Sequence, residues 1–162
     1  MGMIWTANRL SEAQARELLI DPEAYFSFIE EDHSEHAIDL DKAWQGIHWL
    51  LTGSAGPTDT AESLAIYGWE AGELLEIDAG YGQPALLWPD RVQDVNAALQ
   101  RLTDQELQQR FNPEQMSNSP LYPDLWDEED IFETYLLPYA QQLRKFYAAA
   151  ARNRQAVVMA IT

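Results

Sequence analysis

Histidine is the side chain in this sequence best suited to acid–base or metal chemistry at neutral pH, because the chain has three histidines and no cysteine. His48 lies in the run Ile38–Gly53, where Trp44, Ile47 and Leu51 recur at a helical spacing. On such an apolar face a histidine can serve as an acid, a base or a ligand, or as a core residue bonded to a neighbour. The core interpretation fits the packed face better, and a pocket near His48 stays the alternative.

The other two histidines, His33 and His36, stand three residues apart in an acidic segment. That spacing can place two imidazoles on one face of a helix, as in some metal sites. The segment lacks the apolar residues that would hold metal ligands rigid. We therefore expect an exposed acidic link here and assign no metal site.

The remaining patterns point to structure. Asp39 and Asp41 precede the expected helix, where a carboxylate can accept a hydrogen bond from a first-turn amide. Gly80 and Gly82 lack the third glycine of a dinucleotide-binding loop, and the chain contains neither a phosphate-binding P-loop nor a His-Glu-x-x-His motif. No catalytic residue and no cofactor is assigned.

Two acidic runs carry the candidate partner-binding residues, and aromatic residues flank both. Aromatic anchors ringed by charge suit the recognition of a basic protein. A solvated face with ordinary helix-dipole complementation is the alternative interpretation. The candidate residues are Glu30, Glu31, Asp32, Glu35, Trp126, Asp127, Glu128, Glu129 and Asp130.

The charge balance favours the same kind of partner. Ten Lys and Arg residues against 27 Asp and Glu residues give a net charge of −17. Such a chain repels phosphate, so we expect neither nucleic-acid binding nor attachment to anionic membranes. A basic protein would be attracted, with a strong dependence on salt.

The elements that must position these residues can be read from periodicity and turn chemistry. Ile38–Gly53 is expected to form one buried helix that ends at Gly53, and Ala156–Ile161 a central strand buried on both faces. Residues 112–124 are expected to form a long, functional loop, and Pro138 a kink in the last helix. Further expectations are a first strand at Met3–Trp5, short strands at Leu74–Ile77 and Ala85–Trp88, capping boxes at Ser11 and Thr103, and a left-handed cap at Asn153. Together these elements predict the α+β class, with a small mixed β-sheet packed against several helices in a single domain over residues 1–162.

The chain also resembles a known family over nearly its whole length. The residues that carry the likeness are Asp39-Leu40-Asp41-Lys42-Ala43-Trp44, His48, Leu51-Thr52-Gly53, the opening Met1-Gly2-Met3-Ile4 and the closing Ala156–Ile161. They are similar to the YfbM-like family, small bacterial proteins classed as a domain of unknown function. The resemblance implies an α+β fold and a bacterial source, and it implies no reaction.

These observations support a non-enzymatic, acidic protein-binding domain, and its sharper form is an immunity protein that neutralises a basic bacterial toxin. The alternative is an enzyme or small-ligand-binding protein with a pocket formed by Trp44, His48 and Tyr122. No basic start followed by an apolar run marks a signal peptide, so we expect a cytoplasmic location.

Overall fold

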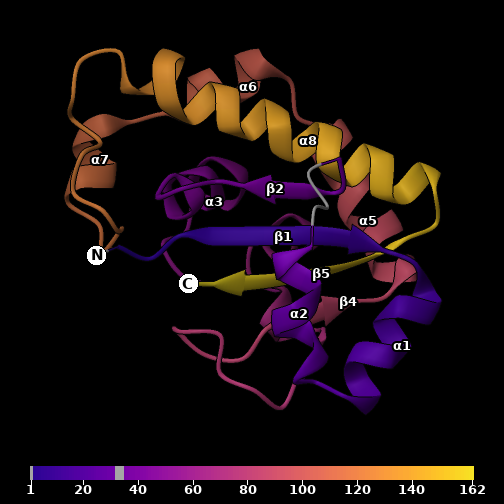
Figure 1. Ribbon diagram of the computed structural model, residues 1–162. Helices are drawn as coiled ribbons and strands as arrows, with labels where there is room; N and C mark the ends of the chain where they lie inside the picture. The colour runs from indigo at the N-terminus through magenta and orange to yellow at the C-terminus, as the bar shows by residue number, and fades with distance from the viewer. Residues whose placement is uncertain (1, 32–34) are drawn as a thin grey trace.

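The computed structural model describes residues 2–31 and 35–162. Across these residues a sheet of five strands has the order β2-β1-β5-β4-β3 (Figure 1). The strands are β1 (Trp5–Leu10), β2 (Ala37–Asp39), β3 (Glu73–Leu74), β4 (Ala85–Leu87) and β5 (Ala156–Ile161). The first strand therefore begins at Trp5 and runs further than expected, and Ala156–Ile161 is confirmed as a central strand.

Every pairing in this sheet is antiparallel. The longest runs between the two ends of the chain, from Trp5 opposite Ile161 to Leu10 opposite Ala156. The α+β class is confirmed, while the sheet that we expected to be mixed is antiparallel throughout the described pairs. Whether two strands pair parallel or antiparallel depends on the path of the chain between them, and local sequence patterns do not encode that path.

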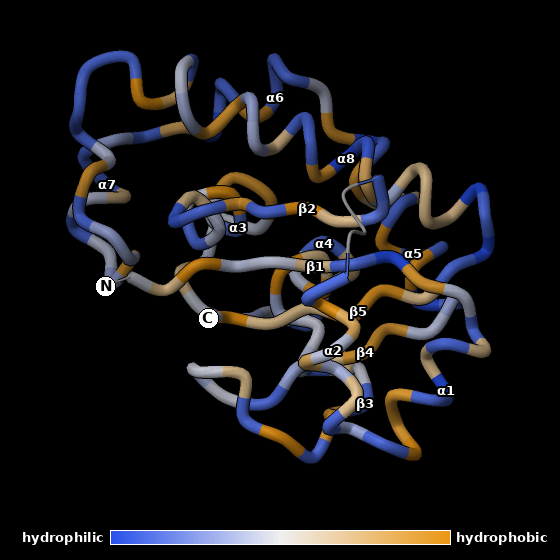
Figure 2. The backbone as a smooth tube through the Cα atoms, viewed as in Figure 1, coloured by the Kyte–Doolittle hydropathy of each residue, from blue (hydrophilic) through white to orange (hydrophobic). Residues whose placement is uncertain are grey.

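Helices cover both faces of the sheet (Figure 1). On one face Val157 and Met159 of β5 join a core that includes α3 (Trp44–Thr52), α5 (Pro89–Gln100) and α8 (Leu137–Arg152). On the other face Val158 and Ala160 pack with α1 (Glu12–Ile20) and α2 (Ala24–Glu30). This explains why the strand is apolar without alternation, as Figure 2 shows for β5.

Several cap predictions are confirmed. Ser11 with Gln14 and Thr103 with Glu106 form complete capping boxes, the second at the start of α6 (Asp104–Arg110). Gly53 ends α3 with φ 74°, a left-handed conformation that glycine adopts without strain.

The predicted start of the central helix is wrong, because Ile38 and Asp39 pair with β1 and α3 begins only at Trp44. Asp39 does not cap the helix: its Oδ1 accepts from the amide of Asp41 at 2.7 Å and closes a turn. Asp41 has φ 48°, and its Oδ2 accepts from the hydroxyl of Tyr135 at 2.8 Å. Both carboxylates thus shape the turn between strand and helix.

The second half of the chain departs from expectation in three places. Residues 112–124 hold a short helix, α7 (Pro113–Ser117), whose first turn is capped by the Asn112 side chain. Before Pro138 the chain forms a π-helical turn, η2 (Phe132–Leu136), which accommodates a residue without an amide proton. The left-handed residue after α8 is Arg154, at φ 51°, and not Asn153.

Two short elements complete the fold: α4 (Ala61–Leu64) and the 3-10 helix η1 (Gly68–Glu70). Among the described residues no helix combines the length and the apolar character that crossing a bilayer requires.

Candidate functional site

His48 is fully buried, and both of its ring nitrogens are hydrogen-bonded. Nδ1 lies 2.9 Å from the carbonyl of Ser54, which can only accept, so Nδ1 carries the proton. Nε2 is then an acceptor, and the hydroxyl of Ser63 donates to it at 2.8 Å. Burial lowers the pKa of His48 below its ordinary value, against the opposing effect of the Ser54 carbonyl. His48 is therefore a neutral histidine inside the core.

Ser63, the partner of His48, is also fully buried. Its Oγ accepts from the amide of Thr58 at 2.9 Å, and its own amide donates to the hydroxyl of Thr60 at 3.2 Å. The His48–Ser63 pair thus ties α3 to the loop that precedes α4. A serine–histidine pair can activate a nucleophile, but here neither side chain reaches solvent.

Trp44 and Tyr122, the other residues of the expected pocket, hold the start of the chain. The indole of Trp44 donates to the carbonyl of Met3 at 3.0 Å, and the amide of Met3 donates to the hydroxyl of Tyr122 at 3.1 Å. Between Trp44 and His48 stands Tyr67, in edge-to-face contact with both rings. The three residues therefore belong to connected packing, and none of them lines the cleft described below.

The two acidic runs lie in different parts of the molecule (Figure 1). Glu30, Glu31 and Glu35 are exposed around the end of α2, and Asp32, like His33, lies outside the described residues. Asp127, Glu128, Glu129 and Asp130 are exposed in the turn before η2.

Trp126 cannot be the aromatic anchor of the second run, because its side chain is fully buried. Its ring packs against α3 at Gly46, where an added Cβ would lie 2.5 Å from a ring carbon of Trp126. An aromatic residue beside charges in the sequence was expected at the surface, but the absence of a side chain at Gly46 admits it to the core.

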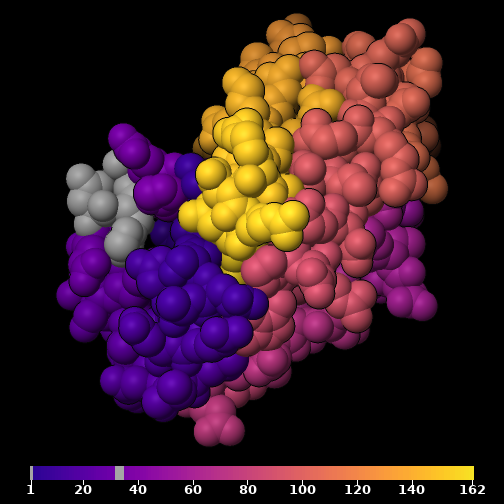
Figure 3. All heavy atoms as spheres, turned by 90° about the vertical axis from the view of Figure 1, so that its right-hand side faces the viewer, coloured from indigo at the N-terminus to yellow at the C-terminus, as the bar shows by residue number. Residues whose placement is uncertain are grey.

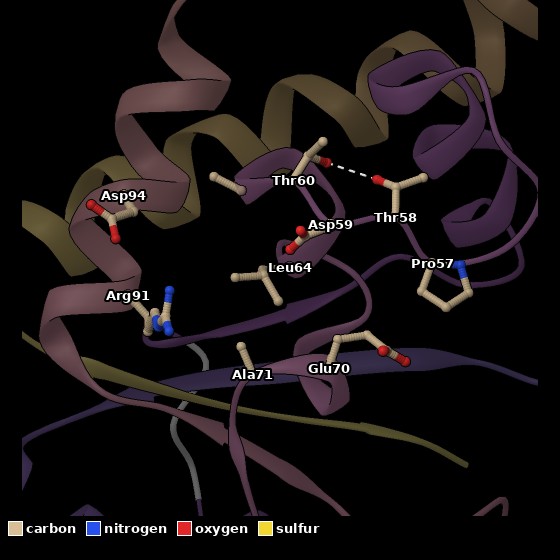
Figure 4. A pocket seen from close by; sticks show the side chains of 10 residues that line it. Pro57, Thr58, Asp59, Thr60, Leu64, Glu70, Ala71, Arg91 and Asp94 are labelled. Atoms are coloured by element: carbon tan, nitrogen blue, oxygen red, sulfur yellow. Dashed lines mark hydrogen bonds between the residues drawn. The ribbon is translucent and has the colours of Figure 1, made fainter.

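A polar cleft of about 640 Å³ is lined in part by the loop whose Thr58 amide is bonded to Ser63 (Figure 4). Asp59 and Thr58 come from that loop, Glu70 from η1, and Arg91 and Asp94 from α5. The full lining is Pro57, Thr58, Asp59, Thr60, Ala61, Leu64, Glu70, Ala71, Arg91 and Asp94. The cleft brings together carboxylates from three segments that are distant in the sequence.

The three carboxylates of this cleft are not neutralised within the described structure. The side chains of Asp59, Glu70 and Asp94 are exposed, and no ion pair or side-chain hydrogen bond to them is present among residues 2–31 and 35–162. With Arg91 the lining carries a formal charge of −3 + 1 = −2. Such a cleft attracts a cation, and the hydroxyls of Thr58 and Thr60, 2.8 Å apart, add hydrogen-bonding groups at its edge.

No group of three or more His, Asp or Glu side chains in the described part of the chain is arranged to hold a metal ion. The cleft offers charged side chains and hydroxyl groups.

Sequence reasoning did not find this cleft. Arg91 and Asp94 share a face of α5 at a spacing of one turn, which was a readable signal. Asp59 and Glu70 gave no such signal in the sequence, because their position in the same cleft depends on how the loop and η1 pack beside α5.

Comparison with known proteins gives a family and a fold. A family model described as a domain of unknown function (DUF1877) matches residues 1–160. A crystal structure described as YfbM, a protein of unknown function from Escherichia coli, matches with a TM-score of 0.76 at 20% identity, over 99% of this chain and 100% of that one. No match was found among curated proteins. At this identity the solved structure supports the fold alone.

Proposed function

The chain belongs to the family described as a domain of unknown function (DUF1877), a membership that assigns no reaction, and we propose that it is a non-enzymatic binding protein for a basic protein partner. The family agrees with the resemblance to YfbM-like proteins found in the sequence. One observation carries the proposal: the cleft collects the unneutralised carboxylates of Asp59, Glu70 and Asp94.

Electrostatics explains why such a cleft would receive a lysine or arginine side chain. Exposed carboxylates that line one cleft add their potentials, and partly closed walls strengthen the field inside. The net charge of −17 draws a basic partner toward the chain from any direction, and the cleft provides a specific place for one of its cations.

The burial of His48 supports a binding role over an enzymatic one. Proton transfer to a substrate requires an acid or base within hydrogen-bond reach of it. His48 and Ser63 have no solvent-exposed surface, and their bonds to Ser54 and Thr58 already use their polar atoms. The pair acts in this proposal as a positioning element for the loop that carries Asp59.

The sharper form of the proposal is an immunity protein that acts in the cytoplasm and neutralises a basic toxin. A toxin that acts on nucleic acid presents cationic groups, which carboxylates can occupy. Capture of a basic protein that stops growth when expressed without this chain would support this form.

Affinity capture from bacterial lysate at low and at high salt tests the general proposal. We expect a basic protein that is retained at low salt and released at high salt. The triple variant Asp59→Asn, Glu70→Gln, Asp94→Asn should lose it. The matched control Glu17→Gln, Asp21→Asn, Glu23→Gln changes the charge equally at exposed sites, one in α1 and two in the turn between α1 and α2, and should retain it.

A third variant tests whether the second acidic run is the binding surface; its substitutions are Glu128→Lys, Glu129→Lys and Asp130→Lys. Loss of capture in this variant alone would move the binding surface from the cleft to that run. Absence of any specific basic protein at low salt would contradict the proposal as a whole.

A further inference from the structure

The outer edge of β2 has backbone groups that no described residue satisfies. The bonds from the Leu40 amide to the Trp5 carbonyl and from the Arg9 amide to the His36 carbonyl fix which residues of this segment face β1. Antiparallel pairing alternates, so Ile38 also faces β1, while the N–H and C=O groups of Ala37 and Asp39 point outward. In the described chain these four groups form no hydrogen bond. They present the pattern that another strand pairs with.

A groove of about 420 Å³ separates this edge from α8. Ala37, Ile38 and Asp39 form one wall, and Gln142, Lys145 and Phe146 of α8 stand across from them. Figure 3 shows this side of the molecule, where the yellow C-terminal part of the chain lies beside the indigo and purple N-terminal part. The volume is in the range of sites for small ligands, which suits a few residues of extended chain.

The charge of the groove differs from that of the rest of the chain. Its lining contains two cations, Arg9 and Lys145, and two carboxylates, Glu35 and Asp39. Burial and the nearby charge of Arg152 lower the pKa of Arg9, against the opposing effect of Glu35. The groove is thus not net negative, although the whole chain carries −17.

Of the two cations that line the groove, Lys145 is the one without a partner among the described residues. Arg9 already donates to the side chain of Gln155 at 2.8 Å and to the carbonyl of Glu35 at 3.0 Å. Lys145 is exposed and has no ion pair or hydrogen bond within the described residues, and the same holds for the Gln142 side chain one turn away. A carboxylate and a hydrogen-bond acceptor on the occupant would satisfy them.

We propose that the groove between β2 and α8 binds an extended segment of a partner protein, which pairs with the outer edge of β2 and places a carboxylate at Lys145. Strand addition of this kind takes its affinity from main-chain hydrogen bonds and its specificity from the side chains along the groove. A second copy of this chain is disfavoured as the occupant, because two chains of net charge −17 repel each other far more strongly than one chain repels a short segment with a single carboxylate. The inference is independent of the proposed basic partner, which uses the cleft lined by α4, η1 and α5, because the cleft and the groove share no lining residue.

Panning a phage library of random linear peptides against the full chain supplies the probe. The best selected peptide is then synthesised with a fluorophore, and its affinity is measured by polarisation. We expect the peptide to carry an Asp or Glu side chain that pairs with Lys145. We also expect the amides of Ala37 and Asp39 to exchange more slowly with solvent in the complex, because both become hydrogen-bonded.

Two variants locate the binding. Ala37→Pro removes one outward N–H and leaves the bonds to β1 in place, a position where an edge strand tolerates proline. It should weaken the peptide about tenfold, whereas Ala37→Val, which keeps the N–H, should not. Lys145→Glu should weaken it by a similar factor, and Arg16→Glu on α1, an equal charge change, should leave it unchanged.

The inference is overturned if panning yields no binding peptide, or if the selected peptide binds Ala37→Pro and Lys145→Glu as tightly as the unaltered chain. Panning could instead select cationic peptides that bind Ala37→Pro but do not bind the triple variant Asp59→Asn, Glu70→Gln, Asp94→Asn. That result would likewise overturn the inference, while it would support the proposed function.

Discussion

Ser63 Oγ and His48 Nε2 lie 2.8 Å apart, and neither residue has solvent-exposed surface. Through the second bond of Ser63, to the amide of Thr58, this contact connects the central helix α3 to the wall of the polar cleft. The residue that the sequence suggested for chemistry thereby positions residues that line the polar cleft.

Replacement of His48 by Ala should destabilise the fold strongly. The change leaves a cavity and removes the partners of the Ser54 carbonyl and the Ser63 hydroxyl, so we expect a loss of about 3 kcal/mol in the free energy of unfolding. Denaturant unfolding measures it. A loss below about 0.5 kcal/mol, the level of an ordinary surface change, would contradict the structural role.

The stability should depend on pH through His48. Its folded-state pKa lies below the ordinary value of 6.5, so the unfolded chain takes up a proton more readily. The contribution of neutral His48 is complete above 6.5 and is lost as the pH falls below 6.5 toward the folded-state pKa. We expect the stability difference between the unaltered chain and His48→Gln to shrink from pH 7.5 to pH 5.5. A constant difference would contradict the assignment.

Gly46→Ala should be destabilising, although alanine is the better helix former. The new Cβ would lie 2.5 Å and 2.6 Å from ring carbons of buried Trp126 and 2.8 Å from Leu136. We expect a loss of about 2 kcal/mol from this overpacking, measured by denaturant unfolding. Gly56→Ala, where an added Cβ meets nothing within 4 Å, is the control. An equal or higher stability for Gly46→Ala would show that Trp126 is not packed against α3.

Tyr135→Phe should weaken the turn before α3. The hydroxyl of Tyr135 donates to Asp41 and accepts from the amide of Lys42 at 3.2 Å. Burial, with the bond to Asp41, raises the pKa of this hydroxyl, so it stays a donor well into the basic range. We expect a loss of about 1 to 2 kcal/mol in the free energy of unfolding. Tyr81→Phe, at an exposed side chain, should change little, and equal effects of the two variants would contradict the prediction.

The parts of the fold that the sequence predicted are those encoded locally. The capping boxes at Ser11 and Thr103, the left-handed Gly53 and the buried strand Ala156–Ile161 each depend on neighbouring residues. The start of α3 was predicted wrongly because Asp39 pairs with Thr6 in the sheet. The residues around Asp39 in the sequence give no sign of this distant pairing.

The candidate site was predictable only in part. The burial of His48 follows from the helical spacing of its apolar neighbours, and the structure agrees. The cleft is lined by Asp59 from a loop, Glu70 from a 3-10 helix and Asp94 from α5, and how these segments come together depends on tertiary packing. The assignment of Trp126 as a partner-binding residue is wrong for the same reason, because the burial of its ring depends on Gly46 in α3.

The most direct measurement for the binding role is the dissociation constant of the captured basic partner, determined for the unaltered chain and for the two triple variants at low and high salt. The cleft variant Asp59→Asn, Glu70→Gln, Asp94→Asn should bind at least about tenfold more weakly at low salt, with a smaller difference at high salt. The control at Glu17, Asp21 and Glu23 should stay close to the unaltered chain. Equal weakening in both variants would mean that net charge alone attracts the partner, and it would contradict a specific role for the cleft.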